Sequence, residues 1–274
     1  MVNGSSERRF RILVSDIDGT LLRDGEPTRG LGTLRRMLAA GGDDVRLAYA
    51  TGRTFDSVRE LVEQGALPRP QAIAALVGTE LWLPPWEAVD EVYAREISHG
   101  WNREAVEEIV AGHSGEIEPQ PEVYQSPWKA SYFLERESLV PSLEREIAER
   151  GVEAQLIHSS VDLLDVIPAR AGKRPAAEHL CRRWDVSSGD VLAAGDSGND
   201  LDMLGHPRFM GVAVGNAKEE LDRELDEMPR VHDASRDFAA GVLEGAAVFR
   251  FWPAHARTES DPRSKAALDE SRET

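Results

Sequence analysis

Two aspartates one residue apart, Asp16 and Asp18, follow a short apolar run in the segment SDIDGT at residues 15–20. In an extended segment, side chains at positions i and i+2 point the same way, so the two carboxylates can converge at the end of a strand. Facing carboxylates repel each other unless a cation or a proton lies between them, and their hard oxygen ligands suit Mg²⁺. An Asp-Gly pair is also common in plain turns, and taken alone this segment fits both interpretations.

Two further segments offer groups that bind phosphate. Thr51 and Gly52 end the second apolar run, where a hydroxyl and consecutive backbone N–H groups could hold phosphate oxygens, although alone they fit a simple turn better. Lys173 opens a predicted helix, and the helix dipole disfavours a cation at that end. An anionic ligand explains a lysine there better than the helix does, whereas an isolated lysine is by default solvated.

A fourth segment, GDSGND at residues 195–200, closes another buried apolar run. Its two glycines allow a tight turn, and Asp196, Asn199 and Asp200 bring oxygen ligands to that end of the strand. The spacing does not match a calcium-binding EF-hand loop, and the flanks are strand-like. Four anion-binding or metal-binding segments at strand ends in one chain indicate a shared metal and phosphate site.

The elements that must position these residues alternate between buried apolar runs and amphipathic helices, which is typical of an α/β fold with a mainly parallel sheet. The strands of this kind are predicted at residues 11–15, 45–50, 73–77, 163–167, 191–194, 210–214 and 230–232. Helices are predicted after residues 27–28, over 55–62, after Lys173 and over 238–249. Ligands of open α/β sheets bind at the carboxyl ends of the strands, where the four segments lie.

The stretch from residue 86 to about 164 has a different texture. It holds most of the tryptophans and tyrosines and two predicted helices, near 101–111 and 139–150. Its strands, at 129–134 and 152–158, alternate like those of a half-exposed antiparallel sheet. We therefore predict three parts of the chain: a discontinuous core at residues 10–84 and 165–252, an inserted α+β domain at 85–164, and a disordered tail at 253–274.

Composition excludes several classes of function. The net charge of −17 argues against a nucleic-acid partner, because the phosphate backbone would repel such a surface. No apolar run approaches the roughly 20 residues of a membrane-spanning helix, and no signal peptide is recognisable. The single cysteine allows no internal disulfide, which suits a reducing compartment, so we expect a cytoplasmic protein. From the charge and the lack of a long apolar run, we expect no nucleic-acid or membrane partner. The acid-rich and lysine-poor composition fits a salty cytoplasm, but a GC-rich genome would also favour arginine over lysine, and composition does not separate the two.

In this order and setting, the four segments resemble the motifs of the haloacid dehalogenase superfamily of phosphohydrolases, whose C2 cap corresponds to the insertion. Further stretches are similar to the sucrose-6-phosphate phosphatase family, over about residues 10 to 252: residues 77–82, 120–122, 128–133, 165–173 and 238–245. One departure is Gly-Lys-Arg at 172–174, where the family often has Gly-Lys-Gly. Because Arg174 is larger than glycine, we expect it to change the fine geometry of substrate binding but not the reaction.

The resemblance implies a role for each motif residue. Asp16 would attack phosphorus to form an aspartyl-phosphate, and Asp18 would act as general acid and then general base. Mg²⁺ would be held by the carboxylates of Asp16 and Asp196 and by the backbone carbonyl of Asp18. Asp200 would order the metal-bound water. The resemblance also implies a group of residues that hold the phosphate: Thr51, Gly52, Lys173 and Asn199.

The predicted cap supplies candidates for contacts with sugar hydroxyls, namely Gln120, Lys129 and Ser131. Lys129 and Ser131 lie at i and i+2 of one predicted strand, so the solvent face of the cap sheet explains them equally well. A closed cap would exclude bulk water from the reaction. Because the cap already covers the site, we expect a monomer.

The resemblance implies sucrose 6-phosphate as the leading substrate. Alternatives are another glycosyl phosphate, such as mannosylfructose phosphate or a glycosylglycerate phosphate. A different class of function is a non-catalytic domain that binds and regulates a glycosyltransferase, which is the expected protein partner. The intact acidic motifs argue against that class, since a scaffold has no need to keep buried like charges together.

Overall fold

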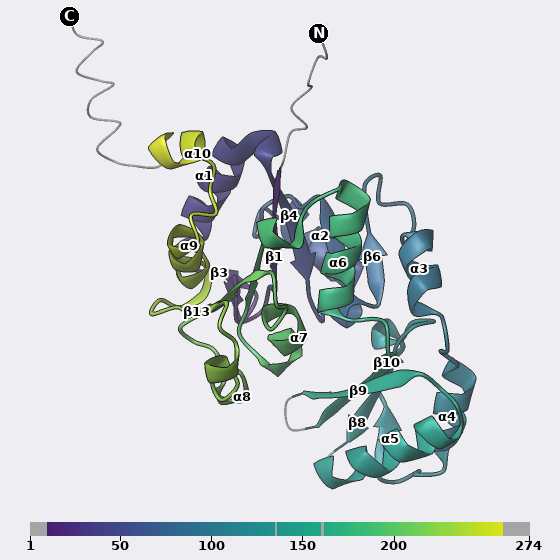
Figure 1. Ribbon diagram of the computed structural model, residues 1–274. Helices are drawn as coiled ribbons and strands as arrows, with labels where there is room; N and C mark the ends of the chain where they lie inside the picture. The colour runs from purple at the N-terminus through teal and green to yellow at the C-terminus, as the bar shows by residue number, and fades with distance from the viewer. Residues whose placement is uncertain (1–9, 135, 160–161, 260–274) are drawn as a thin grey trace, which may run out of the picture. The chain divides into compact units, whose positions relative to one another are not determined.

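The computed structural model describes residues 10–134, 136–159 and 162–259 (Figure 1). Its larger sheet has seven strands in the order β13-β12-β11-β1-β4-β5-β6. The strands are β1 (Arg11–Ser15), β4 (Val45–Ala50), β5 (Ala72–Ala75), β6 (Glu80–Trp82), β11 (Val191–Gly195), β12 (Met210–Ala213) and β13 (Val231–Asp233). The pairs β1–β11, β11–β12 and β12–β13 are parallel, whereas β5 and β6 pair antiparallel. This confirms the predicted α/β fold with a mainly parallel sheet.

The parallel strands are apolar without alternation because both of their faces are buried. All residues of β11 and all but the first of β1 are buried. A parallel sheet covered on both faces selects such continuous runs. The register from Ile12 opposite Val191 to Ser15 opposite Ala194 brings the ends of β1 and β11 level with each other.

The helices predicted after residues 27–28, over 55–62, after Lys173 and over 238–249 are all present. The α-helices before residue 98 and after residue 172 are α1 (Leu31–Gly41), α2 (Phe55–Glu63), α3 (Glu91–Ile97), α6 (Lys173–Trp184), α7 (Leu201–Leu204), α8 (Glu219–Asp222), α9 (Phe238–Val248) and α10 (Ala254–Glu259). Of these, α3 lies within the predicted insertion at residues 85–164 and was not predicted. Side-chain caps begin α2 and α3: Thr54 accepts from Ser57 N before α2, and Asp90 accepts from Tyr93 N before α3.

Shorter elements connect these strands and helices. The 3-10 turns are η1 (Gly42–Asp44), η2 (Leu76–Gly78), η3 (Glu122–Tyr124), η4 (Glu137–Leu139), η5 (Ser188–Asp190), η6 (Gly198–Asp200) and η7 (Leu225–Glu227). A two-stranded hairpin, β2 (Leu22–Arg23) with β3 (Glu26–Pro27), follows the first motif.

The insertion forms a separate antiparallel sheet in the order β7-β8-β10-β9. Its elements are β7 (Ile117–Pro119), β8 (Ala130–Leu134), β9 (Ala154–Ser159), β10 (Leu163–Pro168), α4 (Arg103–Ala111) and α5 (Val140–Glu149). Both helices and the strands of this sheet share one apolar core that includes Val106, Leu134, Leu143, Ile147 and Leu164. The two predicted helices and the predicted antiparallel pairing are confirmed.

Two predictions about individual segments need correction. The sequence groups residues 163–167 with the core strands, but β10 pairs antiparallel with β8 and β9. As a central strand of its sheet it is buried along almost its whole length, so its pattern matches that of a parallel core strand. The predicted tail begins with helix α10, in which Ala256 is buried, and residues 260–274 lie outside the described residues.

The chain divides into two compact units that differ from the predicted boundaries. One is drawn from Met1–Ala48, Gly65–Gln71 and Leu180–Thr274, and the other from Tyr49–Gln64 and Ala72–His179. The second unit thus contains the antiparallel sheet together with Thr51 and Lys173. The insertion boundaries at residues 85 and 164 stay predictions.

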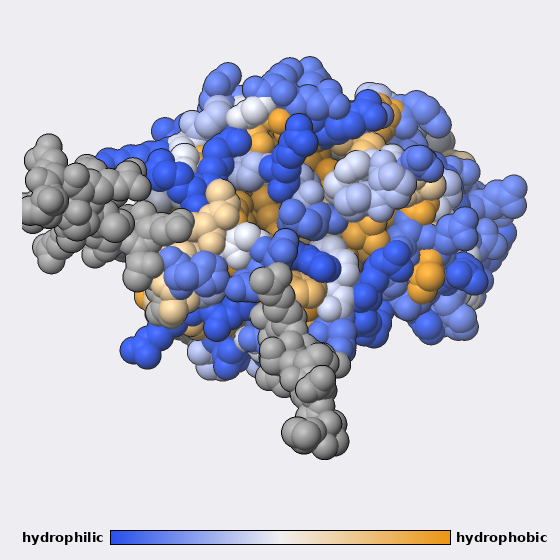
Figure 2. Space-filling view, turned by 90° about the horizontal axis from the view of Figure 1, so that it is seen from above, coloured by the Kyte–Doolittle hydropathy of each residue, from blue (hydrophilic) through white to orange (hydrophobic). Residues whose placement is uncertain are grey.

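Polar residues dominate the face shown in Figure 2, with smaller hydrophobic patches among them. This agrees with the net charge of −17. Within the part of the chain that the structure describes, no helix combines the length and apolarity that a membrane span requires.

Candidate active site

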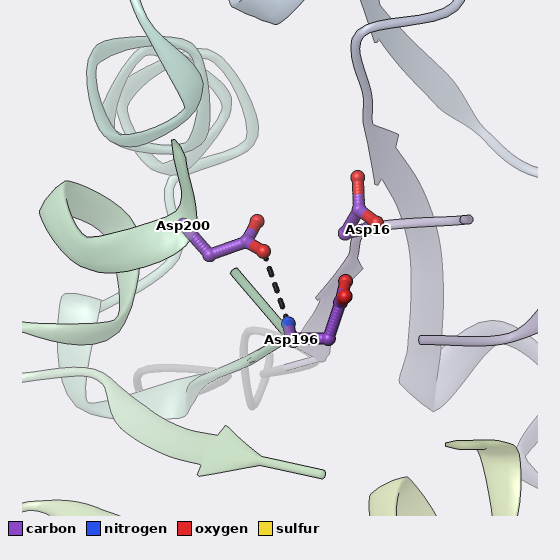
Figure 3. Close-up of side chains that lie close together, drawn as sticks. All are labelled: Asp16, Asp196 and Asp200. Atoms are coloured by element: carbon purple, nitrogen blue, oxygen red, sulfur yellow. Dashed lines mark hydrogen bonds between the residues drawn. The ribbon is translucent and has the colours of Figure 1, made fainter. Parts of the chain in front are cut away.

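Three buried carboxylates gather at the carboxyl ends of β1 and β11 (Figure 3). One oxygen from each of Asp16, Asp196 and Asp200 lies within 4.8 Å of the others. The three residues are 5%, 4% and 0% exposed, so water screens their mutual repulsion poorly. Such a set of hard oxygen atoms fits a divalent cation of the Mg²⁺ type.

The parallel pairing of β1 with β11 creates this cluster. Asp16 N donates to Ala194 O over 2.9 Å, which extends the ladder one residue beyond β1. Asp196 directly follows β11, so the two aspartates leave the same edge of the sheet at the same level. Adjacent carboxyl ends of parallel strands are the usual ligand edge of such sheets.

Asp200 shapes the turn that presents Asp196. Its Oδ2 accepts hydrogen bonds from Asp196 N at 3.0 Å, drawn in Figure 3, and from Ser197 N at 3.2 Å. A β-carbon on Gly195 would lie 2.3 Å from Asp200 Cγ, so only glycine leaves room for this carboxylate. Asn199 is in the same turn, where its Oδ1 accepts from Ser197 Oγ over 3.2 Å.

The first motif approaches Asp196 through its backbone. Gly19 has a φ of +83°, and a β-carbon there would lie 2.2 Å from Asp196 Oδ2. Thr20 Oγ1 donates to Asp196 Oδ1 over 3.1 Å, and Asn216 Nδ2 donates to Gly19 O over 2.7 Å. Thr20 and Asn216 therefore hold the site together, and the sequence analysis missed both. The sequence signal that could have identified them is position: Thr20 lies inside the first motif, and Asn216 lies just after β12.

Asp16 and Asp18 occupy different environments. Asp16 is buried in the cluster, whereas the Asp18 side chain is exposed and is not a member of it. The i, i+2 argument does not reach Asp18 because β1 ends at Ser15 and the chain then turns, with Leu21 N and Leu22 N donating to Ile17 O. The two carboxylates can thus serve different chemical roles.

In the second unit, Thr51 and Gly52 form a loop directly after β4. Thr51 is 1% exposed, its N–H donates to Ala74 O over 2.9 Å, and its Oγ1 accepts from Arg53 N over 3.2 Å. The hydroxyl is therefore held in place by the backbone around it. Gly52 is exposed.

Lys173 is the first residue of α6 and is only 1% exposed. Lysine is almost never buried to this extent unless it is paired with an anion. The N-terminal end of a helix disfavours cations. Because Lys173 is buried there, it is not the solvated lysine that an isolated case would suggest. The predicted role in phosphate binding is compatible with this environment and stays a prediction.

The three predicted cap residues differ in their surroundings. Lys129 Nζ lies 2.6 Å from Asp165 Oδ1 and donates to Ser131 Oγ over 2.5 Å. Lys129 is 3% exposed and Ser131 is 0% exposed, so the solvent-face interpretation is wrong. Gln120 is half-buried, and its Nε2 donates to Tyr132 O over 2.8 Å. Asp165, which completes the ion pair, was not identified from the sequence.

Comparison with known proteins shows the family of the chain. Residues 9–250 match the family model of sucrose-6F-phosphate phosphohydrolase. The chain belongs to this family. Membership in the sucrose-6F-phosphate phosphohydrolase family confirms the predicted haloacid dehalogenase fold with a C2 cap, and it places the chain among phosphohydrolases.

Several curated relatives of the chain are sugar phosphatases by name. A probable sucrose-phosphatase 3a from Arabidopsis thaliana is 31% identical over 258 residues, covering 88% of this chain and 60% of that protein. A mannosylfructose-phosphate phosphatase from Agrobacterium fabrum (strain C58) is 30% identical over 247 residues, covering 89% of this chain and 97% of that protein. The chain thus spans about 60% of the length of the Arabidopsis relative.

Solved structures agree with this assignment. The sucrose-phosphatase from Synechocystis sp. PCC6803, in complex with sucrose and phosphate, is 32% identical with a TM-score of 0.81 and covers 89% of this chain and 100% of its own. A haloacid dehalogenase-like hydrolase from Bacillus subtilis has 20% identity and a TM-score of 0.56, covering 87% and 92% of the two chains, and shows the shared fold.

Proposed function

We propose that this protein is a Mg²⁺-dependent phosphatase that hydrolyses a sugar phosphate by way of an aspartyl-phosphate on Asp16. The observation that carries the proposal is the buried cluster of Asp16, Asp196 and Asp200 in a member of a phosphohydrolase family. Three carboxylates with oxygens within 4.8 Å of one another repel strongly when buried. A divalent cation removes this cost, and a fold without a ligand there would gain nothing from keeping the three charges together.

Asp16 and Asp196 would hold Mg²⁺, and Asp200 would keep Asp196 in place through the hydrogen bond to its N–H. The bound ion would allow the anionic carboxylate of Asp16 to approach an anionic phosphate. The buried position of Asp16 suits a nucleophile, because burial removes the water that competes for its oxygen atoms.

The exposed Asp18 would handle the protons of the two half-reactions. It would donate a proton to the leaving sugar oxygen and then remove one from the water that attacks the aspartyl-phosphate. Its exposure supports this role, since the residue must reach both a leaving group and a water molecule. The phosphate oxygens would be held by a group of residues that the family resemblance assigns: Thr51, Gly52, Lys173 and Asn199.

Sucrose 6-phosphate is the leading substrate of this proposal. It is supported by the family match and by 32% identity with the Synechocystis sucrose-phosphatase. Mannosylfructose phosphate is the second candidate, supported by a relative that is 30% identical and that the chain covers to 97%. Both candidates contain fructose, so we propose a fructose-containing disaccharide phosphate as the substrate class.

The test is phosphate release from a panel of substrates, with Mg²⁺ and with EDTA. The panel contains sucrose 6-phosphate, mannosylfructose phosphate, glucosylglycerate phosphate, trehalose 6-phosphate and fructose 6-phosphate. We expect Mg²⁺-dependent turnover with the highest kcat/KM for one of the two fructose-containing disaccharides. A flat profile would contradict the substrate class, and the absence of all turnover would favour the regulatory alternative.

A further inference from the structure

The turn η2 that follows β5 has a backbone that L-residues rarely adopt. Leu76, Val77 and Gly78 have φ values of 49°, 61° and 79°. Left-handed conformation is unfavourable for any residue with a β-carbon and most unusual for β-branched valine. Such conformations persist only where surrounding contacts impose them, and they concentrate at functional sites.

One side of this turn is hydrogen-bonded to the loop after β4. Leu76 N donates to Arg53 O over 2.9 Å, and Val77 N donates to Thr51 O over 2.8 Å. The Val77 side chain also lies beside Gly52, because a β-carbon on Gly52 would be 4.0 Å from Val77 Cγ2. The turn therefore sets the position of the backbone that carries the Thr51 hydroxyl.

The other side of the turn lies against the start of α6. Gly78 O accepts from Gly172 N over 3.4 Å. A β-carbon on Gly78 would lie 2.3 Å from Gly172 O and 2.8 Å from Lys173 N, so only glycine permits this approach. Gly172 O in turn accepts from Ala176 N over 3.1 Å in the first turn of α6. The same short turn thus contacts the backbone of both Thr51 and Lys173.

Tyr93 of α3 locks the turn in place. Its side chain is buried, and its hydroxyl donates to Gly78 O over 2.6 Å, much shorter than the 3.4 Å bond from Gly172 N. The hydroxyl also lies 3.5 Å from Gly172 O. The Tyr93 ring meets the ring of His179 in α6 edge-on at 5.2 Å, and His179 Nδ1 lies 3.1 Å from Glu96 Oε2. Helix α3 is thereby attached to α6 through the contacts of Tyr93 and Glu96 with His179.

We infer that the turn Leu76–Gly78, held by the Tyr93 hydroxyl, is a positioning device that fixes the spacing between Thr51 and Lys173. The inference rests on the proposed function, in which both residues hold oxygens of one phosphate. Two groups that bind the same small anion must keep a constant separation, because a shift of about 1 Å can cost about a hundredfold in rate. Tyr93 is therefore a positioning residue and does not itself touch the substrate.

The test is Tyr93→Phe in the full chain, with binding of inorganic phosphate measured by calorimetry in the presence of Mg²⁺. Loss of the hydroxyl should raise the Kd for phosphate by about tenfold and lower kcat/KM to a similar extent. The matched control is Tyr132→Phe, which removes a hydroxyl from the equally buried core of the antiparallel sheet. It should leave phosphate binding within about twofold of the wild type.

A second variant, Val77→Gly, tests the turn without removing the hydrogen bond of Tyr93. Glycine accepts the left-handed backbone, so the variant should fold, but the freed turn should again weaken phosphate binding. If either folded variant only lowers Tm and binds phosphate like the wild type, the inference is overturned. Wild-type protein that binds phosphate but hydrolyses no sugar phosphate would instead refute the proposed function.

Discussion

At the scale of single residues, the site depends on close contacts that only particular side chains allow. The sequence identified Asp16, Asp196 and Asp200 because each belongs to a dense polar motif at a strand end. It did not identify Thr20, Asn216 or Asp165, since the partner of each side chain is distant in the sequence. Which of two neighbouring aspartates is buried was also invisible, because that depends on where β1 ends.

Gly19→Ala should damage the site much more than the strain of its backbone explains. A β-carbon there would lie 2.2 Å from Asp196 Oδ2, in addition to the cost of a φ of +83°. Gly25→Ala is the matched control, because Gly25 has a φ of +82° and nothing lies within 4 Å of the added carbon. Both variants should lose about 1–2 kcal/mol of stability from strain. Only Gly19→Ala should lose at least about tenfold in kcat/KM, and equal losses would contradict this account of Asp196.

Glu80 supplies a prediction about pH. Burial raises the pKa of its carboxyl, against a smaller lowering by the hydrogen bond from Trp82 Nε1 at 3.1 Å. The folded state therefore binds this proton more tightly than the unfolded state, so the residue costs stability once the pH rises above its unfolded pKa. Glu80→Gln should gain stability relative to the wild type as the pH rises from acidic to neutral in urea unfolding. The exposed Glu87→Gln is the control, and the same trend in both variants would refute the burial effect.

At the scale of elements, periodicity located most helices and strands but could not assign every strand to its sheet. Strands β1, β11 and β12 were found because continuous apolar runs indicate burial on both faces. Strand β10 has the same pattern, and only its pairing with β8 and β9 shows that it belongs to the antiparallel sheet. The left-handed turn η2 had no signal, because Leu76 and Val77 extend the apolar run of β5.

The ion pair inside the antiparallel sheet should show in stability. Lys129→Met leaves Asp165 buried without the charge that lies 2.6 Å from it, and should cost about 3–5 kcal/mol in urea unfolding. The double variant Lys129→Met, Asp165→Leu removes both charges and should recover most of that loss. If the double variant were less stable than the single one, the unpaired carboxylate would not be the cause of the destabilisation.

At the scale of the whole molecule, a strongly acidic protein concentrates three of its carboxylates at one buried site. The net charge of −17 makes the general field repel a phosphate ester, so the proposed cation and Lys173 would have to overcome this repulsion. The four motifs were sufficient to predict the superfamily, the fold and the class of reaction, and further stretches of sequence predicted the family. The substrate was not predictable to the same degree, because relatives with different printed substrates are about equally similar, at 31% and 30% identity.

Metal binding should therefore stabilise the whole fold. Mg²⁺ at about a hundred times its Kd should add about 2.7 kcal/mol to the free energy of unfolding, since the unfolded chain lacks the site. Thermal unfolding should show a rise in Tm with Mg²⁺ that EDTA reverses. Asp196→Asn should lose this rise while keeping the hydrogen bond between its own N–H and Asp200. A Tm that does not respond to Mg²⁺ in the wild type would contradict the metal site.

The measurement that tests the central claim most directly is the kcat of Asp16→Asn on the best substrate of the panel, at saturating Mg²⁺. Asparagine keeps the shape of the side chain but cannot form the acyl-phosphate, so phosphate release should fall to the background of the assay. The variant should remain folded, as its unfolding curve in urea would show. Turnover equal to that of the wild type would contradict nucleophilic attack by Asp16.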